Sequence, residues 1–255
     1  MRTEPMSLFL EAWKKMTSTL PSPNHDDNGP VSNRFCAAPN LFFNLWFQNR
    51  PTPDEAAFRE MLRIGKAQGA RWNQVAGGII SSAWSPESWE EIVADEGFAV
   101  MLSMVGMEAA ELTPAPFPPA DLEISRISTD EAAHAAAMIN AHAYHMEEEQ
   151  FTCCGGMHFY PGDSMAYVGY VDGRPVCTAG VRPVNGTIYV YLVATEPGEQ
   201  GKGYAATVMR HAMDEGRKAI DLPLLTLHAT TGGQKTYEKM GFTAGATTPL
   251  IVPAG

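Results

Sequence analysis

The sequence has 255 residues, of which 45% are hydrophobic and 18% charged, and its formal net charge is −11. This composition is typical of a globular protein with a sizeable core, and its acidity makes nucleic acid and anionic membranes unfavourable partners. Because no stretch approaches the roughly 20 apolar residues of a membrane helix and residues 1–13 lack a signal-peptide pattern, we expect a cytoplasmic protein.

The first half of the sequence alternates strand-like and helix-like segments. The expected elements are a strand at residues 41–47, a helix at 55–68, a strand at 72–80, a helix that starts near Ser85, and a strand at 98–107. Thr52 or Asp54 is expected to cap the first helix, because both side chains accept hydrogen bonds from free backbone N–H groups. Residues 1–115 are therefore predicted to form an α/β N-terminal domain, with a loop at residues 21–30.

A proline-rich segment at residues 112–121 divides the sequence. Its four prolines disfavour a helix or a central strand and favour an extended connector. A strand is expected at residues 122–127, followed by a helix that Thr129 caps. Residues 121–255 are predicted to form the second domain.

Two dipeptides in the second half predict hairpin turns. Asp172–Gly173 and Asn185–Gly186 each separate strand-like runs, and both dipeptides tolerate the positive φ angles that two-residue hairpins require. They predict a three-stranded antiparallel meander. Its last strand, residues 187–195, is apolar on both faces, so we expect it to lie in the centre of a sheet.

A glycine-bearing loop follows that central strand and leads into a helix expected at residues 204–218. The loop and the start of the helix read EPGEQGKGYA over residues 196–205. The free N–H groups of a first helical turn attract anions, and glycine lets a phosphate approach the backbone. The segment lacks the third glycine of a dinucleotide-binding loop and the Gly-Lys-Ser/Thr ending of a P-loop, so it fits neither signature.

Two motifs resemble those of the GCN5-related N-acetyltransferase (GNAT) superfamily. Residues 200–205, QGKGYA, match its pyrophosphate-binding signature Q/R-x-x-G-x-G/A, and residues 237–242, YEKMGF, are similar to its Y-E-K-x-G-F segment. The resemblance covers about residues 121–255 in element order. It implies an α+β fold with a mixed, mostly antiparallel sheet flanked by helices, and an enzyme that transfers the acetyl group of acetyl-CoA to an amine. The N-terminal half resembles the degenerate first half of some two-part members.

The resemblance also implies roles for individual residues. Tyr237 would donate a proton to the departing thiolate, because a phenol with a pKa of about 10 and a thiol with a pKa of about 8.5 can exchange it. An amide N–H near Val193 would polarise the thioester carbonyl. Thr230 stands where many members have asparagine and is only a weak replacement for that contact to the cofactor. The residues expected to bind acetyl-CoA are Val193, Ala194, Thr195, Gln200, Gly201, Lys202, Gly203, Tyr204, Ala205 and Thr230.

Several assignments stay open from the sequence. Glu196, His228 and the acidic run at residues 147–149 are candidates for the base that removes the amine proton, and each also has an ordinary structural explanation. The acceptor is expected to be a small-molecule or peptide amine, and its identity is undetermined. The length of the acyl donor and the oligomeric state are also undetermined. The alternative function is a non-catalytic acyl-CoA-binding sensor or partner-binding module.

Histidines and cysteines gather at residues 142–158. The zinc-ligand types in this stretch are His142, His145, Cys153, Cys154 and His158. Because the two cysteines are adjacent and no second pair exists, we expect free thiols and no metal. Phe151, Phe159 and Tyr160 in the same stretch are candidates for lining an acceptor pocket.

Overall fold

The computed structural model describes residues 4–72, 76–115 and 118–254, which form two compact units. Unit 1 comprises Met1–Met107, His228–Lys235 and Ala244–Gly255, and unit 2 comprises Glu108–Leu227 and Thr236–Thr243. The C-terminal strand thus packs with the N-terminal segment, whereas the sequence-based boundaries put every residue after 121 in one domain. Residues 116 and 117 of the expected connector lie outside the described residues.

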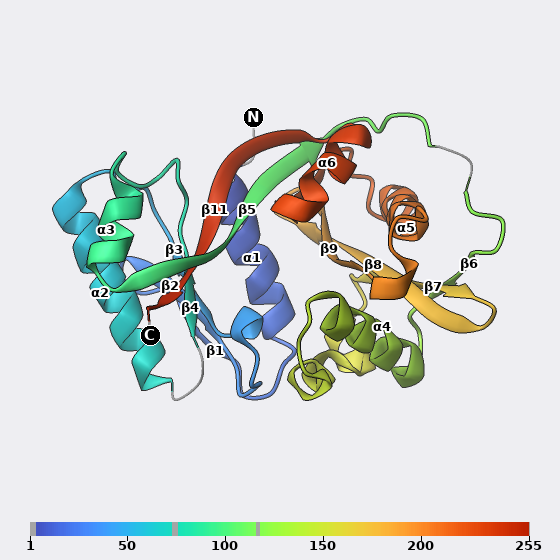
Figure 1. Ribbon diagram of the computed structural model, residues 1–255, viewed down its shortest axis with the longest axis horizontal. Coiled ribbons are helices and arrows are strands. Elements are labelled where there is room, and N and C mark those ends of the chain that lie inside the picture. Colours follow the sequence, from blue (N-terminus) through green and yellow to red (C-terminus); the bar gives the residue numbers. More distant parts are fainter. Residues whose placement is uncertain (1–3, 73–75, 116–117, 255) are drawn as a thin grey trace. The chain divides into compact units, whose positions relative to one another are not determined.

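Unit 1 contains a mixed sheet in the order β1-β2-β3-β4-β11-β5. Strands β1 to β3 are antiparallel neighbours, β4 runs parallel to β3, and β11 pairs antiparallel with β4 through Leu250–Ile79. The elements are α1 (Pro5–Thr17), β1 (Asn24–Asp26), β2 (Val31–Phe35), β3 (Leu45–Gln48), α2 (Glu55–Arg71), β4 (Gly77–Ile79), α3 (Trp89–Asp95) and most of β5 (Phe98–Ala109) and β11 (Thr243–Pro253) (Figure 1).

The side chains of β3 divide the unit 1 core into two clusters. Leu45 and Phe47 pack in one cluster with Phe9 of α1, and Trp46 between them packs in the other with Leu62 of α2. Successive side chains of a strand point to opposite faces, so one strand can serve both clusters. Each of these fully buried aliphatic or phenyl side chains contributes about 1.5–3 kcal/mol of hydrophobic free energy.

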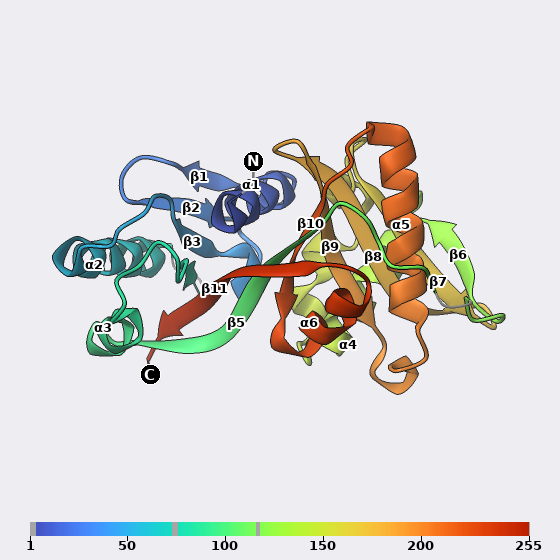
Figure 2. The ribbon, with the colours of Figure 1, turned by 90° about the horizontal axis from the view of Figure 1, so that it is seen from above.

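The part of the sheet in unit 2 has the strand order β10-β9-β8-β7-β6, in which only β9 and β10 are parallel. Helices α4 and α5 cover opposite faces of it (Figures 1 and 2). The elements are β6 (Glu123–Arg126), α4 (Asp130–Ala143), β7 (Met165–Val171), β8 (Arg174–Val184), β9 (Thr187–Thr195), α5 (Tyr204–Ile220), the 3-10 turns η2 (Glu148–Gln150), η3 (Thr152–Cys154), η4 (Met157–Phe159) and η5 (Pro197–Glu199), and parts of β10 (Leu225–Thr230) and α6 (Thr231–Lys239). The expected α+β class with mixed, mostly antiparallel pairing is confirmed.

The local signals of the second half are confirmed. Asp172 and Gly173 have φ angles of 50° and 72°, and Asn185 and Gly186 have 46° and 77°. These values are those of two-residue hairpin turns with both central residues at positive φ. Strand β9 pairs with both β8 and β10, so it is internal, as its apolar sequence indicated.

Two capping predictions are also confirmed. The Asp54 side chain accepts a hydrogen bond from the Ala57 N–H at 2.9 Å, and Thr129 Oγ1 accepts one from Ala132 at 3.2 Å. Each bond satisfies an N–H group that has no partner within the helix.

Several element predictions in unit 1 were wrong. Residues 41–43 form a 3-10 turn, η1 (Leu41–Phe43), because the Asn40 side chain accepts a hydrogen bond from the Phe42 N–H at 2.9 Å and closes a turn before β3. Ser85 does not cap a helix, since its hydroxyl donates to the Ser81 carbonyl, and α3 begins only at Trp89. The strand expected at 72–80 is the shorter β4, and residues 73–75 lie outside the described residues.

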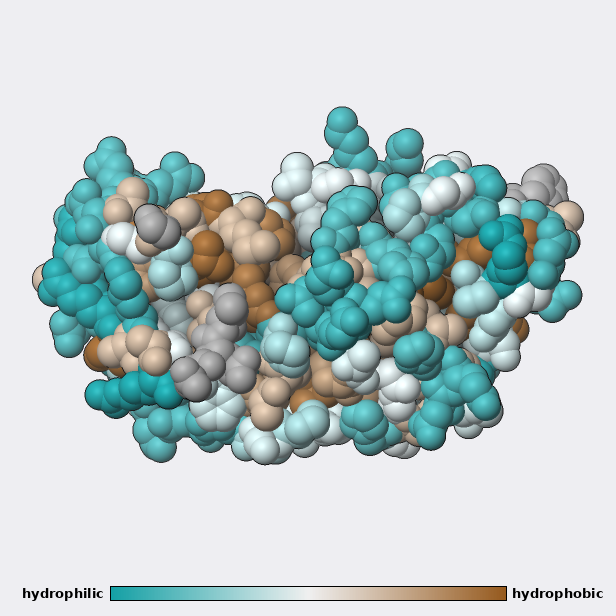
Figure 3. Space-filling view, turned by 60° about the horizontal axis from the view of Figure 1, so that its bottom comes forward, coloured by the Kyte–Doolittle hydropathy of each residue, from teal (hydrophilic) through white to brown (hydrophobic). Residues whose placement is uncertain are grey.

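Among the described residues, no helix combines the length and apolar character needed to cross a membrane. The face of the molecule in Figure 3 carries mostly hydrophilic residues, with hydrophobic residues in separate patches between them. This surface agrees with the acidic composition of the sequence.

Candidate active site

Strand β9 carries a bulge near its C-terminal end. Thr178 of β8 pairs with Ala194 and Gly180 pairs with Tyr191, so Leu192 and Val193 together oppose one residue of β8. Leu192 has a φ angle of 49°, which is unusual for a non-glycine residue. Such bulges bend a strand and redirect its backbone groups.

The bulge coincides with the point where β9 and β10 separate. Their parallel pairing involves Ile188 with Leu225 and Tyr189 with Thr226, and among the described residues it extends no further. The backbone of residues 190–195 is therefore free of a β10 partner on that side. Val193 and Thr195, whose main-chain groups were expected to contact a ligand, belong to this free edge.

The loop after β9 has an open backbone at the start of α5. Gly201 and Gly203 have φ angles of +80° and +84°, and a Cβ added to either would meet no atom within 4 Å. Gly203 is the N-cap of α5, and no side chain caps the free N–H groups of the first turn. Bare N–H groups, the helix dipole and room for a ligand together favour an anion at this position.

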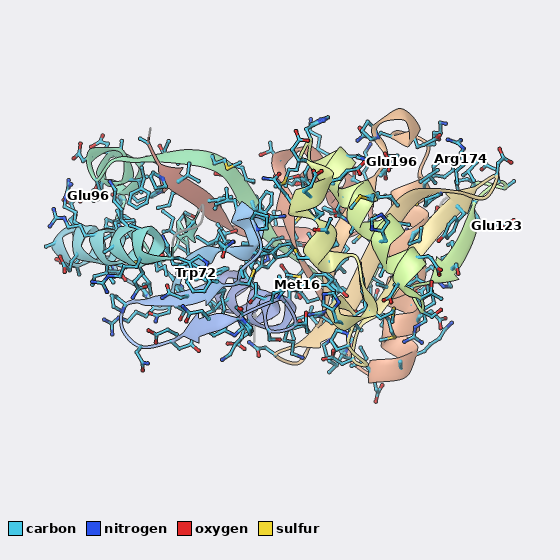
Figure 4. All side chains as sticks on the ribbon, turned by 90° about the horizontal axis from the view of Figure 1, so that it is seen from below. Met16, Trp72, Glu96, Glu123, Arg174 and Glu196 are labelled. Carbon is cyan, nitrogen blue, oxygen red and sulfur yellow. The ribbon has the colours of Figure 1, made fainter. Side chains whose placement is uncertain are left out.

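Charged side chains surround this loop. Glu199 forms ion pairs with Lys202 at 2.6 Å and with Arg174 at 3.4 Å (Arg174 is labelled in Figure 4). The hydrogen bond from Lys202 is the main cause that lowers the pKa of Glu199. The side chains of Lys202 and Arg174 are more than half exposed, so these pairs are weak and an incoming anion can compete for both cations.

Tyr204 anchors the first turn of α5. It is buried, and its hydroxyl donates a hydrogen bond to Asp121 Oδ2 at 2.8 Å. This bond, with burial as the second cause, raises the pKa of Tyr204 to about 12. Gln200, Tyr204 and Ala205 belong to the continuous segment 200–205 that the sequence motif covers. The side chain of Tyr204 is bonded to Asp121, so it has a structural role in addition.

Tyr237 lies near the end of α6 and is half-buried. Its ring makes an edge contact with Phe242 at a centroid distance of 6.1 Å. Burial, with a smaller contribution from Tyr144, raises the pKa of the Tyr237 phenol, so its hydroxyl carries a proton at neutral pH. Thr230, the last residue of β10, is half-buried and groups with unit 1.

Glu196 has a partner that the sequence did not indicate. His142 Nδ1 lies 2.9 Å from Glu196 Oε1, and His142 Nε2 lies 3.0 Å from Glu148 Oε1 (Glu196 is labelled in Figure 4). The hydrogen bonds to Glu148 and then to Glu196 raise the pKa of His142. Two candidates for the base, Glu196 and Glu148, therefore share His142 as a hydrogen-bond partner. The sequence could not indicate this contact, because 54 positions separate His142 from Glu196 and each residue is an ordinary polar residue in its own segment.

The remaining candidate base, His228, belongs to the packed interior of unit 1. Its ring stacks on Phe9 with centroids 4.2 Å apart, and burial lowers its pKa to about 3, so the ring is neutral at physiological pH. His158 Nε2 lies 2.8 Å from the Cys153 carbonyl oxygen. Within the described residues, no group of three or more histidine, cysteine and acidic side chains is arranged to hold a metal ion.

Comparison with known proteins identifies the family. Residues 126–242 match the model of the Acetyltransferase (GNAT) family, and this range includes both motifs. Residues 126–242 are therefore a GNAT-family domain, which confirms the resemblance of residues 200–205 and 237–242. An acetyltransferase type of function follows from the family.

Solved structures show that the fold extends over almost the whole chain. A GCN5-related N-acetyltransferase from Kribbella flavida has a TM-score of 0.71 and 18% identity, covering 99% of this chain and 97% of its own. A functionally unknown conserved protein from Staphylococcus epidermidis has a TM-score of 0.63 and 14% identity, covering 91% and 94%. A tandem GNAT protein from the clavulanic acid biosynthesis pathway has a TM-score of 0.56 and 10% identity, covering 97% and 95%. At these identities the likeness establishes the GNAT fold.

Proposed function

We propose that this protein is an N-acetyltransferase that transfers the acetyl group of acetyl-CoA to the amine of a small-molecule or peptide acceptor. The observation that carries the proposal is the junction of β9 and α5. A bulged strand with a free edge leads into two positive-φ glycines and an uncapped helix N-terminus. Backbone N–H groups arranged in this way suit a pyrophosphate, and membership of the family supports acetyl-CoA as the donor.

Each part of the junction has a role in holding acetyl-CoA. The backbone N–H groups of residues 200–205 bind the pyrophosphate, and Lys202 adds positive charge beside it. Val193, Ala194 and Thr195 form hydrogen bonds with the amide groups of the pantetheine arm, as a sheet edge does with an added strand.

The acetyl group is transferred by direct attack, without a covalent enzyme intermediate. Acetyl-CoA supplies an activated thioester. The neutral amine nitrogen of the acceptor attacks the carbonyl carbon, and the C–S bond breaks as the C–N bond forms. The nitrogen releases one proton to water, and a proton from water restores the Tyr237 phenol after it has protonated the sulfur. The Val193 N–H on the bulge donates a hydrogen bond to the carbonyl oxygen, and the Tyr237 hydroxyl donates its proton to the departing sulfur. The raised pKa of Tyr237 keeps this hydroxyl protonated before the transfer.

The first test is a calorimetric titration with acetyl-CoA, coenzyme A and a long-chain acyl-CoA. Acetyl-CoA is expected to bind, and Gly203→Val is expected to abolish binding, because the added side chain occupies the approach to the backbone and strains a φ angle of +84°. Gly186→Val is the matched control, since Gly186 has a φ angle of +77° and open surroundings in the turn before β9, at the opposite end of that strand from the loop. Failure of the wild-type protein to bind any of the three compounds contradicts the proposal.

We further propose that residues 1–115 are a second, degenerate copy of the GNAT fold without a cofactor site. The order of elements β1-β2-β3-α2-β4-α3-β5 repeats in β7-β8-β9-α5-β10-α6-β11, and both copies contain a parallel pair, β3–β4 and β9–β10. The similarity of nearly the whole chain to a tandem GNAT protein supports this interpretation. Titrating acetyl-CoA into the full chain tests it, because a single binding site per chain is expected.

A further inference from the structure

Arg182 of β8 is a buried cation without an acidic partner. Its side chain is fully buried, and its Nη2 lies 3.4 Å from the Phe159 carbonyl oxygen and 3.4 Å from the Tyr191 hydroxyl. Its Nε and Nη1 atoms have no hydrogen-bond partner within the described part of the chain. Both contacts of Nη2 are long, and arginine carries five N–H donors, so most of its hydrogen-bonding capacity is unused.

Burying the charge of Arg182 raises the free energy of the folded state unless a group of opposite charge neutralises it. Removing an ion from water costs several kcal/mol, and a buried ion normally regains that energy from a partner of opposite charge. Arginine cannot escape the cost by losing its proton. An anion that is not part of the polypeptide is the straightforward way to complete the site.

Arg34 of unit 1 shows how this protein treats a buried arginine that is purely structural. Arg34 is also fully buried, yet its Nη2 forms an ion pair with Asp27 at 2.5 Å and its Nη1 donates to the Asn33 carbonyl at 2.7 Å. Both arginines have an Nε without a hydrogen-bond partner, but among the described residues the carboxylate that pairs with Arg34 has no counterpart at Arg182. The difference points to a ligand at Arg182 that supplies the same chemical group.

The side chains around Arg182 are suited to a small polar ligand. The guanidinium lies over the Tyr191 ring at 4.5 Å, and the Tyr191 hydroxyl forms a hydrogen bond with Ser164. The Tyr160 side chain is buried beside this group, and its phenol interacts electrostatically with Arg182 and Tyr191. Three hydroxyl groups and one cation can therefore converge on an anion.

The position of Arg182 connects this group to the proposed reaction. Tyr191 is two residues from Val193, so their Cα atoms are at most about 7 Å apart. Arg182 contacts the Tyr191 hydroxyl, and Tyr191 adjoins the bulge of β9. A small molecule bound to Arg182 at one end could therefore reach, with its other end, the backbone N–H that would polarise the thioester.

We propose that Arg182 binds a carboxylate of the acceptor, so that the substrate class is an amine that also carries a carboxylate, such as an amino acid. This inference rests on the proposed acetyltransferase function. One carboxylate neutralises the single charge of Arg182, whereas a dianionic phosphate would leave an uncompensated negative charge in the same buried site. The incoming carboxylate replaces the two long contacts of Nη2 by shorter charge-assisted hydrogen bonds.

The kinetic test uses matched pairs of amines that differ only in the carboxylate. The pairs are amino acids with their amides, and ω-aminocarboxylates with alkylamines of equal chain length. The wild-type enzyme is expected to prefer the carboxylate member in kcat/KM by about tenfold to a hundredfold, the size of a hydrogen bond to a charged group. Arg182→Gln is expected to remove this preference by lowering kcat/KM for the carboxylate member of each pair far more than for the other member, and Arg182→Lys is expected to retain part of the preference.

A binding test separates failure of this inference from failure of the proposed function. N-acetylamino acids resemble the expected products and require no acetyl-CoA. They are expected to raise the unfolding temperature of the wild-type protein, whereas their amides and the Arg182→Gln variant show no rise. Acetyl-CoA binding without any carboxylate preference contradicts the inference alone. Carboxylate binding without acetyl-CoA binding contradicts the proposed function alone.

The stability of two variants distinguishes a ligand-binding arginine from a structural one. Arg34→Gln is the matched control, because it removes an equally buried arginine that has its carboxylate partner. This variant is expected to unfold at a lower temperature with its substrate preference unchanged. Arg182→Gln is expected to unfold at the same or a higher temperature than the wild type, since it removes an uncompensated charge. A large loss of stability in Arg182→Gln, with equal losses of activity on both members of each pair, overturns the proposal.

Discussion

The junction of β3 with α2 in unit 1 and the junction of β9 with α5 in unit 2 both lead from an internal strand into a helix of 17 residues. In unit 1 the Asp54 carboxylate accepts a hydrogen bond from the first turn of α2, and prolines occupy positions 51 and 53. In unit 2 Gly203 occupies the cap position and provides no side chain. The first helix therefore carries its own anion, whereas the N-cap residue of the second supplies none.

The C-terminal ends of α3 in unit 1 and α6 in unit 2 also differ in their side chains. Residues 93–98 read VADEGF and residues 237–242 read YEKMGF, and in both segments the glycine has a positive φ angle, +74° at Gly97 and +103° at Gly241. Val93 therefore occupies the position equivalent to Tyr237, and its side chain is buried in the core of unit 1. The two units share the backbone that ends the helix, but only unit 2 has a phenol there.

This comparison separates what the fold requires from what the chemistry requires. The strands, the parallel pair and the positive-φ glycine after the helix occur in both units, so they serve the architecture. Of the two strand–helix junctions only that of unit 2 lacks a side-chain cap, and of the two helix ends only that of unit 2 carries a phenol; these are the features that the proposed acetyl transfer uses. Variants that exchange the two kinds of junction can test this division.

The largest effect is expected at the phenol of unit 2. Tyr237→Phe is expected to lower kcat about a hundredfold or more, the range of general acid catalysis, with little change in acetyl-CoA affinity. Steady-state kinetics and calorimetry on the same protein measure both quantities. Tyr170→Phe is the control, because it also removes a phenol from unit 2 but from strand β7. Unchanged turnover in Tyr237→Phe assigns the proton transfer to another group, whereas acetyl-CoA binding by a wild-type protein that turns over no acceptor favours the non-catalytic acyl-CoA-binding role.

The next effect concerns the helix N-terminus itself. Gly203→Asp gives α5 a carboxylate at the position that Asp54 occupies in α2, and acetyl-CoA affinity is expected to fall about a hundredfold as charge-assisted hydrogen bonds are lost. Gly203→Asn has nearly the same shape and a similar tolerance of positive φ without the charge, so it is expected to lose clearly less. Calorimetric Kd values compare the two. Equal losses mean that size, and not charge, excludes the cofactor.

The corresponding change in unit 1 is expected to affect stability alone. Asp54→Ala removes the cap of α2 and is expected to lower the free energy of unfolding by about 1 kcal/mol. Acetyl-CoA affinity and kcat are expected to stay unchanged. Asp54→Asn keeps a capping side chain and is expected to lose only a small part of this energy. Urea unfolding measures the difference, and a loss of cofactor affinity in Asp54→Ala contradicts the assignment of the site to unit 2.

Local signals in the sequence predicted much of unit 2 because each depends on one or two residues. The hairpin dipeptides, the Thr129 cap and the glycines before α5 have the conformations expected of them. Helix α1 was missed because its N-cap is Glu4, which is not among the favoured capping residues. The apolar run at residues 41–47 gave no sign of the turn that Asn40 imposes.

The parts that depend on distant contacts could not be predicted in this way. The pairing of Leu250 with Ile79 joins segments 171 positions apart, and no local pattern specifies it. The bulge at Leu192 and Val193 falls inside a uniformly apolar strand, where periodicity shows nothing unusual. Arg182 was overlooked because its significance is the absence of an acidic partner, which only three-dimensional packing reveals.

The ends of the two internal strands are also held by different chemistry. In unit 1, Gln48 accepts a hydrogen bond from the Ser81 N–H at 2.9 Å and donates one to the Trp84 carbonyl at 3.3 Å. Both interactions are neutral and do not titrate. In unit 2, Glu196 directly follows β9 and is held by His142 of α4, which also binds Glu148. Only the second arrangement should depend on pH in the physiological range.

The direction of that dependence follows from the pKa of His142, which the bonds to Glu148 and Glu196 raise above 6.5 in the folded state. The folded protein therefore binds the proton more tightly than the unfolded chain does. The resulting stabilisation is fully present below pH 6.5 and is lost as the pH rises through the higher folded-state pKa. Because the His142 ring is 39% exposed, screening limits the effect to less than about 1 kcal/mol.

The smallest expected effect is thus a pH-dependent difference between the wild type and His142→Asn. Urea unfolding at pH 5.5 is expected to show the variant less stable than the wild type, and at pH 8.5 the difference is expected to shrink. His145→Asn is the control, because it removes a second histidine just beyond α4 at a positive φ angle of 54° that asparagine tolerates. A difference that is equal at both pH values means that His142 acts through packing alone. The ends of β3 and β9 would then be held in equally pH-independent ways, and the contrast between the two units would be confined to the helix N-terminus and the phenol.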